Sequence, residues 1–109
     1  MSFQRFLSLV EALRQSPAFP AIDAVEERML NSMAATWHTG KRITVMEAMH
    51  MFPGISPSTV HRRLKSLRAQ GLLELVSDEV DTRIKYVTPS KRAEEYFASL
   101  NRCMLEAQA

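Results

Sequence analysis

The feature that most constrains this fold is a pair of short helical segments joined by a tight turn. Residues 44–47 read Thr-Val-Met-Glu, a capping box that predicts a short helix over 45–52. After Pro53-Gly54, Ser56 and Pro57 predict a second helix start, with serine at the N-cap and proline at the first helical position. That helix runs to Gln70, where the following glycine supplies a left-handed stop. Two helices joined in this way predict a helix-turn-helix.

The helix pair is followed at once by two β-rich segments. Residues 72–77 and 83–87 flank the polar stretch 78–82, and this pattern predicts a hairpin, the wing of a winged helix-turn-helix. Helical periodicity and turn residues predict the remaining elements. These are helices over 2–15 and 21–38, a small strand within 41–44, and a last helix started by Thr88-Pro89 and ending near 106.

The predicted fold class is mainly α with a small β-hairpin wing, in one winged helix-turn-helix domain covering 1–109. A chain of 109 residues is one domain's worth and can bury a single core. Within it, residues 1–20 form the N-terminal helix and its break, residues 21–88 the winged-helix core, and residues 89–109 the C-terminal helix. We expect both terminal parts to serve dimerisation.

Four stretches, in this order, carry a resemblance to a known family. They are Ile43-Thr-Val-Met-Glu-Ala-Met49, the segment from Ile55 to Leu73, Asp81-Thr-Arg83, and Val87-Thr-Pro-Ser90. Together they resemble the MarR-type winged-helix regulators over residues 21–92, here as a short variant. The resemblance implies a homodimeric, DNA-binding transcriptional regulator that dimerises through its N- and C-terminal helices and reads a pseudo-palindromic site.

The charge distribution also indicates nucleic acid as a partner. Residues 41–92 hold ten Lys or Arg and five Asp or Glu, a net charge of +5, within a chain whose total is +2. Residues 1–40 carry −1 and residues 93–109 carry −2. A positive centre between slightly negative ends suits a polyanion bound by the middle of the chain.

Helical spacing predicts which side chains of the helix over 56–70 face DNA. Val60, Leu64 and Leu67 share one face and are expected to be buried. The N-terminal half of a recognition helix normally reaches base edges, and later cations contact phosphates. The expected DNA-binding residues are therefore Ser58, Thr59, His61 and Arg62 at bases, and Lys65 and Arg68 at phosphates. Arg62 is the expected reader of guanine.

Two alternatives remain open for this helix. Its cations, Arg63 included, could simply solvate an amphipathic helix. His61 could contact a base or phosphate, or merely cover the helix surface.

The hairpin turn contains Asp81 and Arg83. The resemblance implies that Arg83 enters the minor groove while Asp81 holds it in place, and a narrow A·T groove attracts a guanidinium. Asp78 and Glu79 add negative charge to this turn, which opposes DNA binding. The alternative is that the Asp81–Arg83 pair only stiffens the turn.

The terminal helices display more apolar residues than a winged-helix core can cover. The expected dimerisation residues are Phe3, Phe6, Leu7, Val10, Tyr96, Phe97 and Leu100. The alternative is that both helices pack only on their own domain.

The remaining residues give no sign of catalysis or cofactors. The single cysteine, Cys103, cannot form an intramolecular disulfide, and we expect a plain thiol rather than a redox sensor. His38 and His50 lack partners at metal-ligand spacing. We expect no enzyme, no metal, no cofactor and no membrane span, and a small-molecule effector is not indicated. Without a signal peptide, a cytoplasmic protein is expected.

The sequence therefore predicts a sequence-specific, double-stranded DNA-binding transcriptional regulator, by default a dimeric repressor. Two alternatives remain. One is a winged-helix protein-interaction module without DNA binding, and the other is a replication or phage DNA-binding protein of the same fold.

Overall fold

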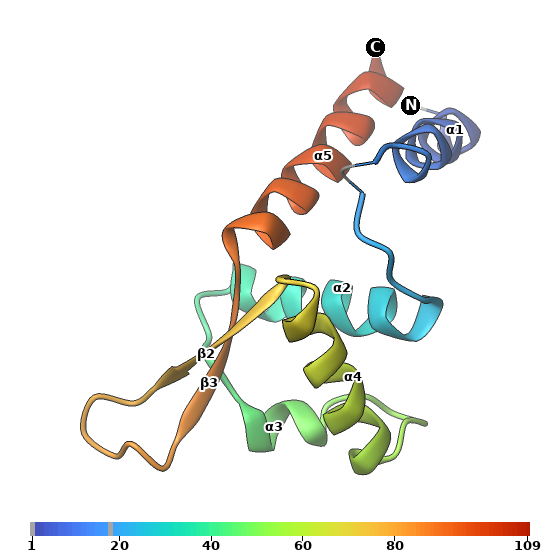
Figure 1. Ribbon diagram of the computed structural model, residues 1–109. Coiled ribbons are helices and arrows are strands. Elements are labelled where there is room, and N and C mark those ends of the chain that lie inside the picture. Colours follow the sequence, from blue (N-terminus) through green and yellow to red (C-terminus); the bar gives the residue numbers. More distant parts are fainter. Residues whose placement is uncertain (1, 18) are drawn as a thin grey trace. The chain divides into compact units, whose positions relative to one another are not determined.

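The computed structural model describes residues 2–17 and 19–109, and these form two compact units (Figure 1). The winged-helix unit comprises residues 22–90, and the terminal-helix unit combines the described residues before 22 with residues 91–109. The winged-helix unit contains α2 (Ala24–His38), β1 (Ile43–Thr44), α3 (Val45–Met49), α4 (Pro57–Ala69), β2 (Leu73–Ser77) and β3 (Lys85–Pro89). The terminal-helix unit contains α1 (Phe3–Arg14) and α5 (Lys91–Gln108).

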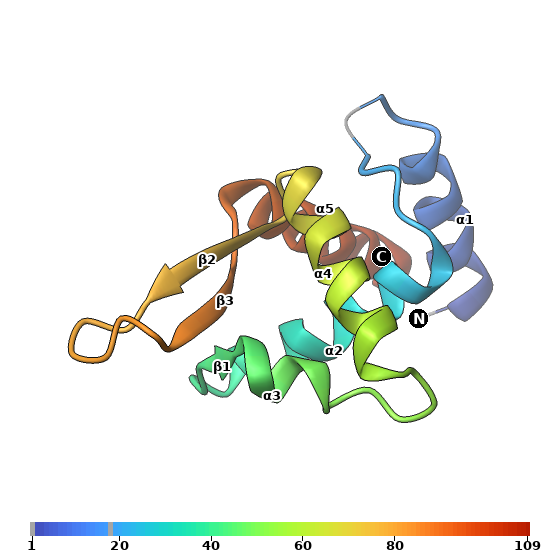
Figure 2. The same ribbon diagram turned by 60° about the horizontal axis from the view of Figure 1, so that its bottom comes forward.

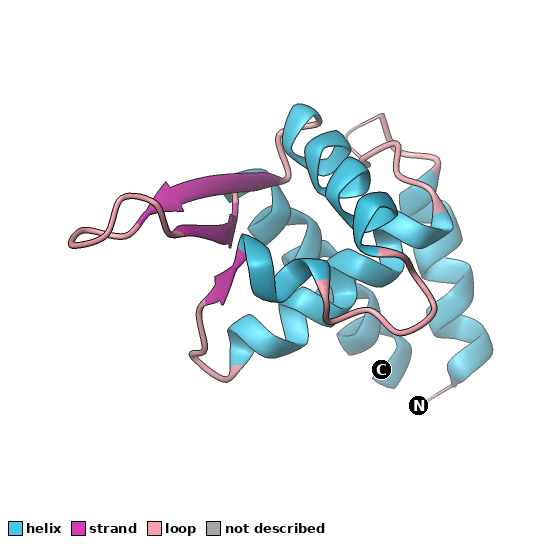
Figure 3. Ribbon diagram, turned by 90° about the horizontal axis from the view of Figure 1, so that it is seen from below, coloured by secondary structure: helices cyan, strands magenta, loops and turns pink. Residues whose placement is uncertain are grey.

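The three strands form one antiparallel sheet in the order β1-β3-β2. Val87 at the centre of β3 lies between Ile43 of β1 and Leu75 of β2. Beyond this point β2 and β3 continue as the predicted hairpin, which extends away from the helices of its own unit (Figure 3). The mainly helical fold with a small β wing is confirmed.

The predicted helix start at Thr88-Pro89 is wrong. β3 continues through Pro89, which lies opposite Leu73, and α5 begins at Lys91. Because β1 begins at Ile43, opposite Val87, the last part of β3 has a neighbouring strand on one side only, where a residue without an N–H is tolerated. Ser90 then leaves the sheet, donating from its N–H to the Leu72 carbonyl at 3.1 Å and from Oγ to the Gly71 carbonyl at 2.6 Å.

Two other helix boundaries differ from the prediction. Helix α2 starts at Ala24 rather than near 21, because Asp23 is its N-cap and forms a capping box with Glu26. The Asp-x-x-Glu spacing is visible in the sequence and could have located this start. Helix α3 ends at Met49 rather than at 52. The capping box of α3 and the Ser56 cap of α4 are confirmed.

The core of the winged-helix unit fixes α4 by one face. Val60, Leu64 and Leu67 are buried, as predicted, together with Met29, Leu30 and Met33 of α2 and Ile43, Leu72 and Val87 around the sheet. Truncating a fully buried leucine such as Leu67 to alanine typically costs about 2–5 kcal/mol. Helix α4 is therefore held firmly along one side, and its opposite side is exposed.

In the terminal-helix unit, α1 packs along α5. Val10 of α1 and Tyr96, Cys103 and Ala107 of α5 are buried there. The Phe19 ring meets the Tyr96 ring edge-on, with centroids 5.2 Å apart. Within the described part of the chain, no helix is both long and apolar enough to cross a bilayer.

Candidate nucleic-acid interface

The exposed face of α4 carries five of the six helix residues predicted to contact DNA. Ser58, His61, Arg62, Lys65 and Arg68 are all exposed, and Thr59 is half-buried. Thr59 also serves the helix cap, since its N–H donates to Ser56 Oγ at 3.3 Å and its hydroxyl oxygen lies 2.9 Å from the same atom. The exposed face therefore combines small polar groups at the N-terminal turn with a row of cations along the helix.

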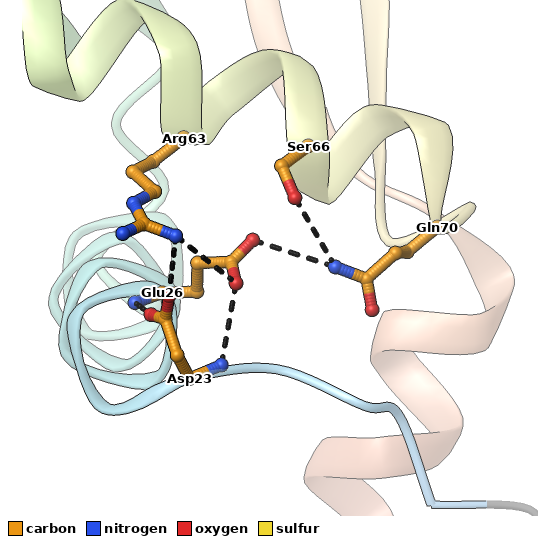
Figure 4. Close-up of polar contacts among 5 residues, drawn as sticks. All are labelled: Asp23, Glu26, Arg63, Ser66 and Gln70. Carbon is orange, nitrogen blue, oxygen red and sulfur yellow. Dashed lines mark hydrogen bonds and ion pairs between the residues drawn. The ribbon is translucent and has the colours of Figure 1, made fainter.

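The fourth cation of α4 has a different environment from the other three. Arg63 forms an ion pair with Asp23, the N-cap of α2, and its Nη1 also lies 3.9 Å from Glu26 Oε1 (Figure 4). The sequence alone counted Arg63 with its neighbours as part of one basic helix. The structure separates it: Arg62, Lys65 and Arg68 face solvent, whereas Arg63 faces α2.

Helix α3 lies beside α4, joined to it by a short turn (Figure 2). This is the helix-turn-helix arrangement, in which the first helix supports the second. The turn is closed where Arg28 Nη2 of α2 donates to the Pro53 carbonyl at 2.9 Å. This hydrogen bond ties the turn before α4 to α2.

At the hairpin turn, Arg83 is held by Asp81. Arg83 Nε donates to Asp81 Oδ1 and Nη2 donates to Oδ2, both at 3.0 Å. The side-chain hydrogen bonds from Arg83 lower the pKa of Asp81 below its ordinary value, and the same bonds raise the pKa of Arg83. The Arg83 side chain is nevertheless 89% exposed, so its charge remains available at the wing.

Asp78 has a structural partner set within the same turn. Its Oδ2 accepts the N–H of Val80 at 3.0 Å and that of Asp81 at 2.9 Å, and its Oδ1 accepts the Tyr86 hydroxyl at 3.2 Å. The backbone hydrogen bond from Asp81 is the main cause of a lowered Asp78 pKa. Asp78 and Asp81 therefore both order the turn, and Glu79 is the exposed acid of residues 78–81.

The base of the wing contains a cation that the sequence analysis did not single out. The Arg42 guanidinium carbon lies 3.5 Å from the centre of the Tyr86 ring, a cation–π contact. On the same strand, the Val87 carbonyl accepts the indole N–H of Trp37 at 3.1 Å. Arg42 follows Lys41 directly, so the dipeptide was a visible signal, but its placement against the wing depends on the β1–β3 pairing.

The predicted dimerisation residues divide by exposure within the terminal-helix unit. Phe3 and Leu7 are exposed, at 65% and 45%, whereas Phe6, Phe97 and Leu100 are half-buried. Val10 and Tyr96 are buried within the unit itself, so they contribute to its core rather than to a free surface. Met104 and Leu105 of α5 add exposed apolar area, and both lie outside the predicted dimerisation set.

No family model matches the chain, and no curated protein matches it. Several solved structures do. A transcriptional regulator from Thermotoga maritima, Tm0710, is 18% identical with a TM-score of 0.62, and the match covers 96% of this chain and 66% of that one. The heme sensor protein PefR from Streptococcus agalactiae, solved with heme, is 16% identical with a TM-score of 0.63, over 95% and 74%.

A probable transcriptional regulator from Pseudomonas aeruginosa is 19% identical with a TM-score of 0.57, over 95% of this chain and 74% of that one. The chain thus spans about two thirds to three quarters of the length of these three structures. At such low identity, the likeness concerns the fold. It confirms the winged-helix architecture that the resemblance to MarR-type regulators implies.

Proposed function

We propose that this protein is a sequence-specific regulator of transcription that binds duplex DNA through its winged-helix unit. The observation that carries the proposal is the face of α4 opposite Val60, Leu64 and Leu67. That face presents Arg62, Lys65 and Arg68 to solvent within a helix-turn-helix. A helix of this kind fits the major groove, which is the groove wide enough to admit it.

The roles within the site follow from position along the helix. Arg62 lies near the N-terminal end and reads a base edge, since its guanidinium can pair with O6 and N7 of guanine. Lys65 and Arg68, further along, contact phosphates and position the protein without specifying sequence. Arg83 reaches the adjacent minor groove from the wing, supported by Asp81.

The regulator acts as a homodimer, most simply a repressor that occupies a promoter in the cytoplasm. The exposed Phe3 and Leu7 of α1 and Met104 and Leu105 of α5 support this part of the proposal. A two-fold symmetric dimer would present two copies of α4 to a pseudo-palindromic site, about one helical turn of DNA apart.

The same apolar residues favour a second candidate function. A winged-helix module that docks another protein through α1 and α5 would also expose Phe3 and Leu105. That candidate does not need the cations of α4, so the two functions differ in their dependence on Arg62, Lys65 and Arg68.

Selection of binding sites from random duplex DNA, combined with a salt titration, tests the proposal. We expect enrichment of a site with two related halves, and an affinity that falls steeply as salt rises, because each phosphate contact releases counterions. Arg5→Ala, at an exposed position of α1 in the terminal-helix unit, is the control for removal of one cation from outside the winged-helix unit. Absence of any enriched sequence and of any salt-dependent binding would favour the protein-docking function.

A further inference from the structure

Two adjacent arginines of α4 lie in different environments, and this difference carries an inference about how DNA is read. Arg62 is exposed, whereas the Arg63 side chain is 33% exposed and reaches the first turn of α2. Arg63, Ser66 and Gln70 all lie along the side of α4 that meets Asp23 and Glu26 (Figure 4). This side runs along the edge of the buried stripe.

The carboxylate of Asp23 binds two partners at once. Its Oδ1 accepts the backbone N–H of Glu26 at 2.8 Å, which caps α2, and its Oδ2 accepts Arg63 Nη1. Helix α4 is therefore joined to the N-terminal end of α2 through Asp23, the same side chain that caps α2. Any rotation of α4 about its axis would strain or break this link.

Glu26 provides a second point of contact between α4 and α2, which further restricts the rotation of α4. Its side chain is only 5% exposed, and a buried carboxylate needs compensating donors. Arg63 Nη1 lies 3.9 Å from Oε1, and Gln70 Nε2 donates to Oε2 at 3.4 Å. Arg63 and Gln70, the C-cap of α4, lie on the same side of the helix about two turns apart. Both side chains thus contact the carboxylate of Glu26 in α2. Apolar contacts such as those of Leu64 have no comparable directional preference.

We infer that Arg63 and Asp23 are positioning residues for DNA reading, which fix the rotation of α4 so that Arg62 faces the base edges. This inference rests on the proposed function. A rotation of about 20° moves a point on the surface of a helix, at a radius of about 5–6 Å, by about 2 Å. That displacement is enough to break a two-point hydrogen bond to guanine. Because 33% of the Arg63 side chain and 43% of the Asp23 side chain remain exposed, solvent weakens the contribution of the ion pair to stability, and we assign the pair a role in direction.

The test uses variants that remove the ion pair and keep the folded elements. Asp23→Asn keeps a side-chain oxygen for the α2 cap and removes the charge. Arg63→Met keeps an unbranched apolar stem and removes the cation, and Arg63→Lys keeps the charge. Arg62→Ala, one residue away, is the matched control. For each, binding-site selection, affinity for the preferred and for a random duplex, and the melting temperature are measured.

We expect Asp23→Asn and Arg63→Met each to lower the ratio of preferred to random affinity by about five-fold or more, and to relax several positions of the half-site together. The double variant should lose no more than the stronger single variant, because both remove one interaction. Arg63→Lys, which keeps the charge, should lower the ratio of preferred to random affinity less than Arg63→Met does. Arg62→Ala should relax one position only.

Three results would overturn the inference, and they are distinguishable. If a variant lowers the melting temperature but keeps the native ratio of preferred to random affinity and the native selected site, the Arg63–Asp23 ion pair is only structural. If Arg63→Met weakens preferred and random duplexes equally and lowers the salt slope, Arg63 is a phosphate contact. If the native protein itself selects no site, the proposed function fails and the inference fails with it. Should Arg63→Met not fold, Asp23→Asn decides the matter alone.

Discussion

Asp81 fixes both the backbone and the side chain of Arg83. Its Oδ1 accepts the Arg83 backbone N–H at 3.1 Å and Nε at 3.0 Å, while Oδ2 accepts Nη2 at 3.0 Å. A guanidinium that is held in this way has already given up part of its rotamer freedom before any DNA arrives. Preorganisation of this kind reduces the entropic cost of binding. The wing therefore presents a charge in a fixed direction rather than a mobile side chain.

The first prediction concerns that charge. Arg83→Ala should weaken binding to sites flanked by A·T pairs more than to sites flanked by G·C pairs, because the narrow A·T minor groove has the stronger negative potential. Fluorescence anisotropy with two duplexes that differ only in their flanks measures the difference. An equal decrease in affinity for both duplexes would make Arg83 a nonspecific phosphate contact, and no decrease for either would make the hairpin purely structural.

Acidification should disorder the wing. Hydrogen bonds lower the pKa values of both Asp78 and Asp81 below the ordinary value of 3.8. Because the folded-state pKa values are depressed, the stabilisation is fully present above about pH 4 and is lost as the pH falls through those lower values. Amide chemical shifts of Val80 and Arg83, followed by NMR, should stay constant from about pH 7 to about pH 4 and move below it.

The matched control for this titration is Asp78→Asn, which removes one of the two carboxylates. Its turn amides should shift already at neutral pH, since Asn accepts the Val80 and Asp81 N–H groups more weakly than a carboxylate does. Turn amides that move between about pH 7 and about pH 5 in the native protein would contradict the depressed pKa values.

How far the sequence predicts this structure depends on whether the signal is local. The caps at Thr44 and Ser56 and the buried stripe of α4 are encoded by neighbouring residues, and they were predicted correctly. The role of Pro89 depends on the length of β1, more than forty residues away in the chain, which no local pattern reveals. The Thr88-Pro89 pair was therefore interpreted as a helix start.

The candidate interface shows the same division. Periodicity places Arg62, Lys65 and Arg68 opposite the buried stripe, and the structure has them exposed. Arg63 was not separated from them, because its environment depends on Asp23, forty residues earlier. A helical wheel gives the direction of a side chain from one helix axis, and it says nothing about which neighbouring helix supplies an acid.

A further prediction concerns oligomeric state. The native protein should sediment as a dimer near twice 12.4 kDa, and Phe3→Glu with Leu7→Glu should give a monomer, because both side chains are exposed apolar groups of α1. Ser8→Glu, an exposed change on the same helix, is the control and should leave the dimer intact. A native monomer at tens of micromolar would contradict dimerisation through this surface.

Gly71, which ends α4, should resist substitution through its backbone alone. Its φ is +76°, and a Cβ built there meets no atom within 4 Å. Gly71→Ala should therefore lower the free energy of unfolding by about 1–2 kcal/mol, the cost of left-handed backbone for an L-residue. Gly71→Asn should cost less, because asparagine tolerates that region better. Chemical denaturation measures both, and a neutral alanine variant would show that the chain relaxes to another conformation.

The last prediction separates base reading by Arg62 from phosphate contact by Lys65 within α4. Arg62 and Lys65 are both exposed cations of α4, less than one turn apart. They therefore carry the same charge at different positions along the helix. Arg62→Ala should weaken binding to the preferred site by about 1–3 kcal/mol and relax the choice of base at one position per half-site. Lys65→Ala should weaken binding to preferred and random duplexes alike. It should also reduce the salt slope by about two units, because one phosphate in each of the two half-sites would no longer be neutralised.

Folding must be intact before these affinities are compared. Both side chains point away from Val60, Leu64 and Leu67, so truncating either should leave circular dichroism and the melting temperature nearly unchanged. With folding intact, the decisive quantity is the ratio of preferred to random affinity, which Lys65→Ala should preserve and Arg62→Ala should lower. If Arg62→Ala keeps full base discrimination, α4 is not the reading helix. The cations of α4 would then serve phosphate contacts, and the bases would be read by another part of the protein.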